Sequence, residues 1–262
     1  MSEYIFKHSF LVSANEANPE GELAVTILVS NLIEVATRAA MDLNIGNPVM
    51  AHLNAGWVLS RLTIELSRYP KVNTYYSIET WVESWNRHFS VRCFEIKDGD
   101  GVTVGYARSV WMVLNTETHE NFGLGHLSLP EGAIKDKDCP IARQEKHVEI
   151  VNEGETGSSS SSLSANTETL LYTFRYNDID FYRHVNTVRY VSLLLNSYSL
   201  EEFDKSFIRR LELSFLHEGN FDETVEIRRF NHDSSLSSFS LFSTKKNLPI
   251  LFARIGLEKR TD

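Results

Sequence analysis

The stretch Arg61-Leu62-Thr63-Ile64 in the first half of the chain has a counterpart, Arg210-Leu211-Glu212-Leu213, in the second half. Both stretches lie in runs rich in β-forming residues, at 57–66 and 208–215, that predict strands. In each half this strand follows a segment whose apolar residues recur at helical spacing. The shared order of strand, helix and further strands indicates an internal duplication.

The first half is expected to form one strand, one long helix and then several antiparallel strands. Asn31 is predicted to open the helix and Gly46 to close it. The inward face of the helix would carry Leu32, Val35, Ala36, Ala39 and Leu43. The strands are predicted at 6–14, 57–66, 75–85, 89–96 and 102–114.

The second half is predicted to repeat this order. A strand is expected at 170–176, and a helix from Val185 to about Leu200. Further strands are expected at 208–215, 224–230, 237–243 and 250–257. Between the halves, the segment 132–166 is polar and carries a run of serines, which predicts a linker. The expected domains are therefore 1–131 and 167–262.

These elements indicate an α+β fold class. One helix cannot cover both faces of a sheet, but a curved sheet can wrap around one helix and bury its apolar stripe. Pairing of the halves along their edges would remove exposed strand edges. The predicted architecture is a tandem (double) hot-dog fold, in which each half is a curved antiparallel sheet wrapped around one long helix.

The composition excludes several classes of protein. The 262 residues are 42% hydrophobic, enough for a sizeable core, and the net charge of −9 argues against non-specific binding to nucleic acid or to anionic membranes. No apolar run approaches the length of a membrane span or suits a signal peptide. Cys93 and Cys139 form no metal-ligand spacing. We therefore expect a cytoplasmic protein without a metal or other cofactor.

The segment 177–187 gathers two carboxylates, a phenol, a guanidinium and an imidazole directly before a helical pattern. Its titratable residues include Asp178, Asp180, Tyr182 and His184. Unpaired N–H groups at a helix N-terminus favour developing negative charge, so the segment fits a general acid/base site acting on a carbonyl. It fits ordinary helix capping equally well.

Several motifs together resemble one known family. They are Trp57-Val58-Leu59-Ser60-Arg61-Leu62, the segments 65–70 and 79–85, and Asp178-Ile179-Asp180 followed by His184-Val185-Asn186. The chain resembles the acyl-acyl carrier protein thioesterases of plant plastids and their bacterial relatives, over nearly its whole length outside the linker. The resemblance implies hydrolysis of the thioester of acyl-acyl carrier protein, which releases free fatty acid and ends fatty acid synthesis.

The resemblance also implies site residues. The family's catalytic Asp and His fall on Asp180 and His184, its helix-capping Asn on Asn186, and its remaining acid on Glu218. The family's Asn between Asp and His falls on Tyr182, so this sequence departs from the family there. The resemblance implies that Tyr182 and Asn186 position the substrate. Plant members carry a Cys directly after the acid. Here that residue is glycine, so covalent catalysis by a thiol is not expected.

Hydrolysis needs an activated water and a stabilised oxyanion. Glu218 is the favoured base, with His184 orienting the water and Asp180 holding its neighbours, although Asp180 or His184 could also take the proton. Backbone amides after His184 would receive the oxyanion. The first half carries no titratable residue between Asn31 and Glu34, so one active site is expected.

The resemblance assigns an acyl-chain pocket to the first half. Its expected lining is Val35, Ala39, Met41, Ala51, Leu53 and Trp57. An acidic acyl carrier protein bearing an acyl-phosphopantetheine would dock on basic residues of the second half, namely Lys205, Arg209, Arg210, Arg228, Arg229, Lys245 and Lys246. Solvated strand edges would explain these residues equally well.

Two other functions fit the same pattern. A hot-dog hydratase also places an Asp and a His near a helix start but acts on an enoyl thioester. A catalytically silent acyl-binding protein would keep the apolar pocket and release no thiol. Association into a homodimer is compatible with each of the three functions.

Overall fold

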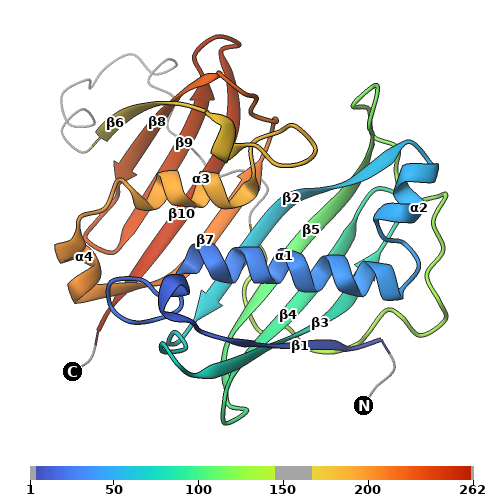
Figure 1. Cartoon of the computed structure of the whole chain (residues 1–262), viewed down its shortest axis with the longest axis horizontal. Helices are drawn as coiled ribbons and strands as arrows, with labels where there is room; N and C mark the ends of the chain where they lie inside the picture. Colours follow the sequence, from blue (N-terminus) through green and yellow to red (C-terminus); the bar gives the residue numbers. More distant parts are fainter. Residues whose placement is uncertain (1–3, 145–166, 261–262) are drawn as a thin grey trace. The chain divides into compact units, whose positions relative to one another are not determined.

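The computed structural model describes residues 4–144 and 167–260, and the chain divides into two compact units, Met1–Arg143 and Gln144–Asp262 (Figure 1). Part of the segment expected to be a linker packs against the first sheet. Cys139 and Ile141 lie in a cluster with Trp81 and Cys93, and Lys137 lies 4.3 Å above the ring of Trp81. The rest of that segment, 145–166, lies outside the described residues.

The first unit is a five-stranded antiparallel sheet with one long helix. The strands are ordered β1-β3-β4-β5-β2. Their bounds are β1 Phe6–Leu11, β2 Ala55–Leu66, β3 Tyr75–Trp85, β4 Ser90–Asp98 and β5 Thr103–Asn115. The helices are the 3-10 turn η1 Ala14–Glu16, α1 Val25–Asp42 and the short α2 Asn47–His52, which the sequence did not predict.

Helix α1 lies across one face of this sheet (Figure 1). Its buried residues recur at helical spacing and are Val25, Leu28, Val29, Leu32, Val35, Ala36 and Ala39. Full burial of a large apolar side chain stabilises the fold by about 1.5–3 kcal/mol. The prediction that Asn31 opens the helix was wrong, because α1 begins at Val25. Asn31 lies inside the helix and its Nδ2 donates to Tyr76 Oη at 2.6 Å.

The second unit repeats the topology, with strand order β6-β8-β9-β10-β7, again antiparallel. Its strands are β6 Thr167–Thr173, β7 Ser206–Phe215, β8 Thr224–Asn231, β9 Leu236–Ser243 and β10 Leu248–Lys259. The 3-10 turn η3 Tyr176–Asp178 and the helices α3 Thr187–Leu195 and α4 Leu200–Lys205 complete it. The equivalent strand orders confirm the predicted duplication and the double hot-dog fold.

The helix of the second unit is shorter than predicted. α3 ends at Leu195, and the chain turns before α4 because Ser199 caps a new helix: its Oγ accepts from the N–H of Glu202 at 3.3 Å. α3 buries Tyr190, Val191, Leu193 and Leu194. The N-terminus of α3 follows the segment in which the sequence predicts the site.

Candidate active site

The loop that carries His184 is a tight turn closed by backbone hydrogen bonds. The N–H of Asp180 donates to the carbonyl of His184 at 2.8 Å, and the N–H of Arg183 donates to the carbonyl of Asp180 at 3.0 Å. Arg183 has a φ of 71°, a left-handed conformation that is uncommon for a residue with a side chain. The turn therefore fixes the backbone of His184 directly before α3.

The first unit contains the same turn before α1. Asn18 donates to the carbonyl of Glu22 at 2.7 Å, Gly21 donates to the carbonyl of Asn18 at 3.0 Å, and Gly21 has a φ of 73°. Asn18 thus corresponds to Asp180, and Glu22 to His184. The expected helix start at Asn31 therefore missed a titratable residue, Glu22, in the turn before α1.

Glu218 meets His184 from the loop between β7 and β8. His184 Nε2 lies 3.1 Å from Glu218 Oε2, and the two side chains are 28% and 35% exposed. The backbone secures this approach, because the N–H of Val185 donates to the carbonyl of Gly219 at 3.0 Å and His184 forms a bridge with Asn220. An imidazole and a carboxylate therefore lie within ion-pair distance in a place that water can reach.

Asp180 acts on the backbone of the loop. Its Oδ1 accepts from the N–H of Tyr182 at 2.9 Å and from the N–H of His184 at 3.3 Å. A carboxylate that holds these amides shapes the turn on which the imidazole stands. Asp180 therefore positions His184 through the main chain.

Asp178 has a different place. It is 3% exposed, and its Oδ2 accepts from Tyr172 Oη at 3.0 Å and from the N–H of Arg175 at 2.7 Å. Arg189 Nε lies 3.2 Å from its Oδ1. These partners hold the carboxylate inside the fold. Asp178 therefore stabilises the turn η3, which comes before the loop that carries His184.

Asn186 caps α3, because its Oδ1 accepts from the N–H of Val188 at 2.9 Å. Tyr182 is 42% exposed, and its ring centroid lies 3.9 Å from that of Phe181. Burial and then the charge of Asp180 raise the pKa of the Tyr182 phenol, so it stays protonated at neutral pH. Tyr182 therefore offers a hydrogen-bond donor at the rim of the loop.

Gly219 stands where plant relatives are expected to carry a thiol. A Cβ at this position would lie 2.7 Å from Tyr190 Oη and 3.0 Å from both Phe174 Cε2 and Val185 Cγ2. Tyr190 Oη accepts from the N–H of Gly219 at 3.0 Å, and burial raises the pKa of the Tyr190 phenol. The buried phenol of α3 thus occupies the space that a side chain at 219 needs.

Two neighbours of Glu218 have structural roles. His217 Nδ1 is 2.7 Å from the carbonyl oxygen of Pro249, so its ring is engaged by the backbone. Glu223, which sequence reasoning missed, is 7% exposed and accepts from the N–H of Asn220 at 3.0 Å and from Lys246 Nζ at 3.1 Å. Glu223 therefore anchors the loop that presents Glu218.

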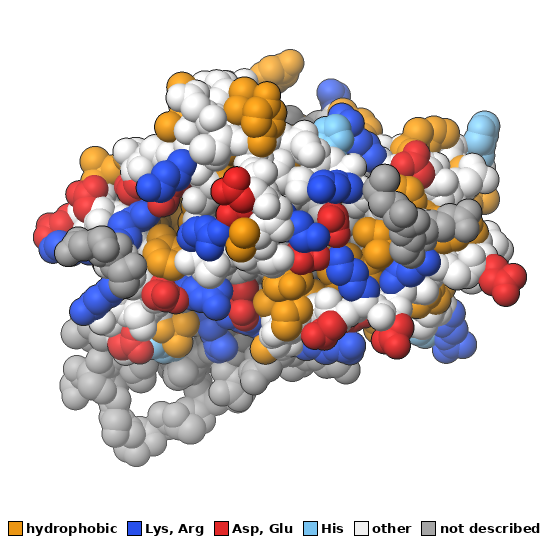
Figure 2. All heavy atoms as spheres, turned by 90° about the horizontal axis from the view of Figure 1, so that it is seen from below, with side chains coloured by type: hydrophobic (Ala, Val, Ile, Leu, Met, Phe, Trp, Pro, Cys, Tyr) orange, Lys and Arg blue, Asp and Glu red, His pale blue; other side chains and the backbone are white. Residues whose placement is uncertain are grey.

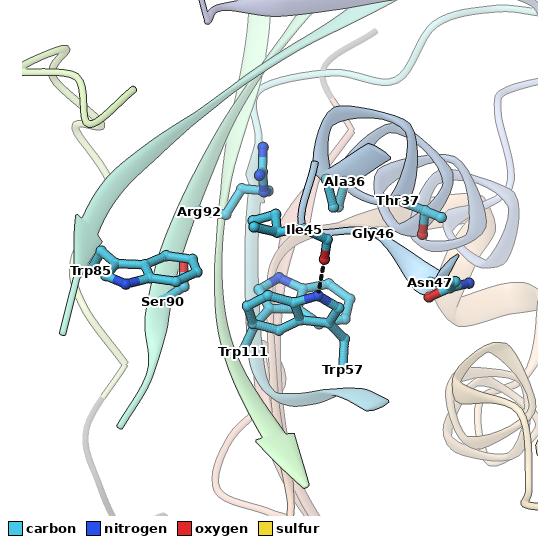
Figure 3. Close-up of a pocket in the computed structure, with 11 residues that line it drawn as sticks. Ala36, Thr37, Ile45, Gly46, Asn47, Trp57, Trp85, Ser90, Arg92 and Trp111 are labelled. Carbon is cyan, nitrogen blue, oxygen red and sulfur yellow. Dashed lines mark hydrogen bonds between the residues drawn. The ribbon is translucent and has the colours of Figure 1, made fainter. Parts of the chain in front are cut away.

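A cavity lies inside the first unit, between the C-terminal half of α1, the turn after it and the sheet (Figure 3). Trp57, Trp85, Trp111 and Arg92 are among its lining residues. Of the residues expected to line an acyl-chain pocket, Trp57 lines this cavity. The other expected residues are not among the lining: Val35 and Ala39 are buried in the core, and Met41 is 48% exposed, while Ala51 and Leu53 lie elsewhere.

Most of the basic residues of the second half have acidic partners. The ion pairs are Lys205–Glu201, Arg209–Glu258, Arg210–Glu212, Arg228–Glu226, Arg229–Glu202 and Lys246–Glu223. Figure 2 shows one face of the molecule, on which Lys and Arg are interspersed with Asp and Glu. These pairs neutralise much of the local charge that an acidic partner would meet.

Family models match both units. The N-terminal domain of acyl-ACP thioesterases matches residues 3–122, and the C-terminal domain of the same enzymes matches residues 161–247. The chain belongs to the acyl-ACP thioesterase family. No three His, Cys, Asp or Glu side chains gather as metal ligands in the part of the chain that the structure describes, and none of its helices is long and apolar enough to cross a membrane.

Curated and solved relatives agree with this assignment. A chloroplastic oleoyl-acyl carrier protein thioesterase of Coriandrum sativum is 26% identical over 231 residues, which cover 84% of this chain and 61% of the relative. The chain thus spans about three fifths of the length of such relatives. An acyl-ACP thioesterase structure from Bacteroides thetaiotaomicron is 27% identical with a TM-score of 0.85, covering 97% of this chain and 98% of that one.

A more distant structure supports the fold alone. The 12:0-ACP thioesterase from Umbellularia californica is 18% identical with a TM-score of 0.77, and the match covers 99% of both chains. The double hot-dog architecture is therefore shared across nearly the entire length of both proteins.

Proposed function

We propose that this protein hydrolyses the thioester bond of acyl-acyl carrier protein and releases a free fatty acid. The observation that carries the proposal is the 3.1 Å contact between His184 Nε2 and Glu218 Oε2 in the second hot-dog unit. Family membership supplies the substrate class, a carrier protein bearing an acyl-phosphopantetheine.

The contact supports a general-base route. Glu218 takes a proton from water as the water oxygen adds to the thioester carbonyl carbon. The C–S bond then breaks as the oxyanion collapses, and His184 gives its Nε2 proton to the departing thiolate. Glu218 returns the proton taken from water to His184 across their hydrogen bond, so both groups regain their starting states.

One amide is suited to receive the oxyanion. The N–H groups of Val185, Asn186 and Val188 donate to Gly219, Asp178 and the side chain of Asn186, respectively. Among the described residues, neither a backbone carbonyl nor a side chain accepts a hydrogen bond from the N–H of Thr187. It stands at the first position of α3, where the helix dipole favours negative charge.

The remaining residues act around this centre. Asp180 fixes the turn that carries His184, Asn186 caps α3, and Tyr182 provides a donor for substrate positioning. Docking of the carrier on the basic residues of the second half, a homodimeric state and a cytoplasmic location stay predictions. The acyl chain of the substrate is expected in the first unit.

The proposal is tested by incubating the purified protein with saturated acyl-carrier thioesters of several chain lengths and with the corresponding enoyl thioesters. Release of free thiol from the saturated series is the expected result. Hydration of the enoyl substrate without thiol release would support a hydratase instead. Tight binding of acyl chains without either reaction would identify an acyl-binding protein.

A further inference from the structure

The cavity of the first unit contains a buried positive charge. Arg92 on β4 is 5% exposed and lines the cavity together with Trp57, Trp85 and Trp111 (Figure 3). The walls are otherwise largely apolar, with Ala36 of α1 among them. A guanidinium in such a place is costly unless a partner compensates the charge.

The protein itself offers Arg92 little compensation. Among the residues that the structure describes, the guanidinium has one hydrogen bond, to Thr80 Oγ1 at a long 3.4 Å, and no ion pair with a carboxylate. Burial lowers the pKa of Arg92 to about 10, which still leaves it charged at neutral pH.

The other arginine that is buried among the described residues, Arg229, and the half-buried Arg108 are each paired with an acid. Arg108 Nη2 lies 2.9 Å from Glu83 Oε1, and Arg229 Nη2 lies 2.8 Å from Glu202 Oε1. Arg92 therefore differs from these two arginines in having no carboxylate beside its guanidinium. A missing acid beside a cavity indicates that a ligand supplies the negative charge.

We propose that this cavity binds a free fatty acid, with its carboxylate on Arg92 and its chain against the tryptophan side chains. A carboxylate matches the planar fork of a guanidinium and forms charge-assisted hydrogen bonds with it. An acyl thioester has no charge to offer there, so the site favours the free acid over the thioester. The inference rests on the proposed function only for the source of the acid, which thioester hydrolysis would supply.

The site is tested on the full-length protein by titrating the intrinsic tryptophan fluorescence with dodecanoate, 1-dodecanol and methyl dodecanoate. Dodecanoate should bind at least about tenfold more tightly than the two uncharged compounds, the usual scale for a hydrogen bond to a charged group. Equal affinities for all three compounds in the wild type would overturn the inference, whatever the behaviour of any variant.

Variants show which residue causes the preference for dodecanoate over the uncharged compounds. Arg92→Met should abolish this preference, so that dodecanoate and dodecanol bind alike, whereas Arg92→Lys should keep part of it. Arg38→Met, which removes an exposed guanidinium of α1, is the matched control and should leave the preference unchanged. Retention of the full preference in a folded Arg92→Met protein would show that the carboxylate lies elsewhere.

The binding assay is independent of turnover. The same titration on His184→Ala, which leaves the first unit intact, should give the wild-type preference. A protein that binds dodecanoate at Arg92 but cleaves no thioester would contradict the proposed function and support this inference. An active thioesterase without carboxylate preference would do the reverse.

Discussion

Replacement of Glu218 by Gln isolates the proposed base, because it removes the proton acceptor and keeps the shape of the side chain. Removal of a positioned general base lowers turnover by about a hundredfold or more. A hundredfold loss corresponds to about 2.7 kcal/mol of transition-state stabilisation. The amide can still meet His184, whose Nε2 lies 3.1 Å from Glu218 Oε2 in the wild type.

The same change should affect stability only slightly. The Glu218 side chain is 35% exposed and its partner is 28% exposed, so water screens the pair and its loss should cost less than about 1 kcal/mol. Turnover and stability are thus predicted to separate. A variant that unfolds would lose activity for a reason unrelated to the base. Thermal unfolding of the variant is therefore measured as well.

The assay is the release of free thiol from a saturating acyl-carrier thioester, with thermal unfolding of each variant measured in parallel. Glu34→Gln is the matched control, since it removes a carboxylate from an exposed ion pair with Arg38 on α1. It should leave turnover unchanged. Full activity of a folded Glu218→Gln protein would refute the reasoning and transfer the role of base to Asp180 or His184.

Three further changes test the surroundings of the pair. Gly219→Cys should lower the free energy of unfolding by about 1–3 kcal/mol in urea denaturation, because the new side chain displaces the Tyr190 phenol; unchanged stability would contradict the observed packing. Tyr182→Asn should keep or raise turnover, and its loss would give the phenol a role of its own. Burial alone would raise the pKa of Glu223, but hydrogen bonds from Ser243, Asn220 and Lys246 hold it below the ordinary 4.5. Its stabilisation is therefore complete above that pH and is lost as the pH falls through the folded-state pKa, so Glu223→Gln should lose less stability than wild type between about pH 5 and about pH 3. An identical acid response in wild type and variant would contradict this role.

The strand pattern of this fold was readable from the sequence, but the start of the first helix was not. The strands at 75–85 and 208–215 match β3 and most of β7 because alternating β-forming residues reflect a sheet with one buried face. Helix α1 begins at Val25 after Ala24, which has no side chain able to cap it, so no local signal marked this boundary.

The linker prediction shows where composition fails. The segment around Lys137 is polar, yet its ammonium lies 3.1 Å from Glu79 Oε2 and 2.7 Å from Glu95 Oε2 on the first sheet. Burial alone would raise the pKa values of both carboxyls, but hydrogen bonds lower them, from Lys97 and Lys137 to Glu79 and from Lys137 and Thr103 to Glu95. Such partners lie far away in sequence, so the local composition carried no sign of them.

The candidate site was partly readable. The motif around Asp180 and His184 identified the loop. The fold was needed to show that Asp178 is buried and that the acid beside the imidazole is Glu218, which comes from another loop. The sequence did not predict a role for Tyr190 in the site, because a tyrosine at this position fits the apolar pattern of α3. Its contact with Gly219 needs the tertiary structure.

The central claim is that this protein cleaves acyl-carrier thioesters through the pair of His184 and Glu218. The most direct test compares thiol release by the wild type and by His184→Ala over a panel of acyl chain lengths. We predict release by the wild type with at least one chain length, and turnover lower by about a hundredfold or more in the folded variant. No release by the wild type with any chain, or equal rates for both proteins, would contradict the account.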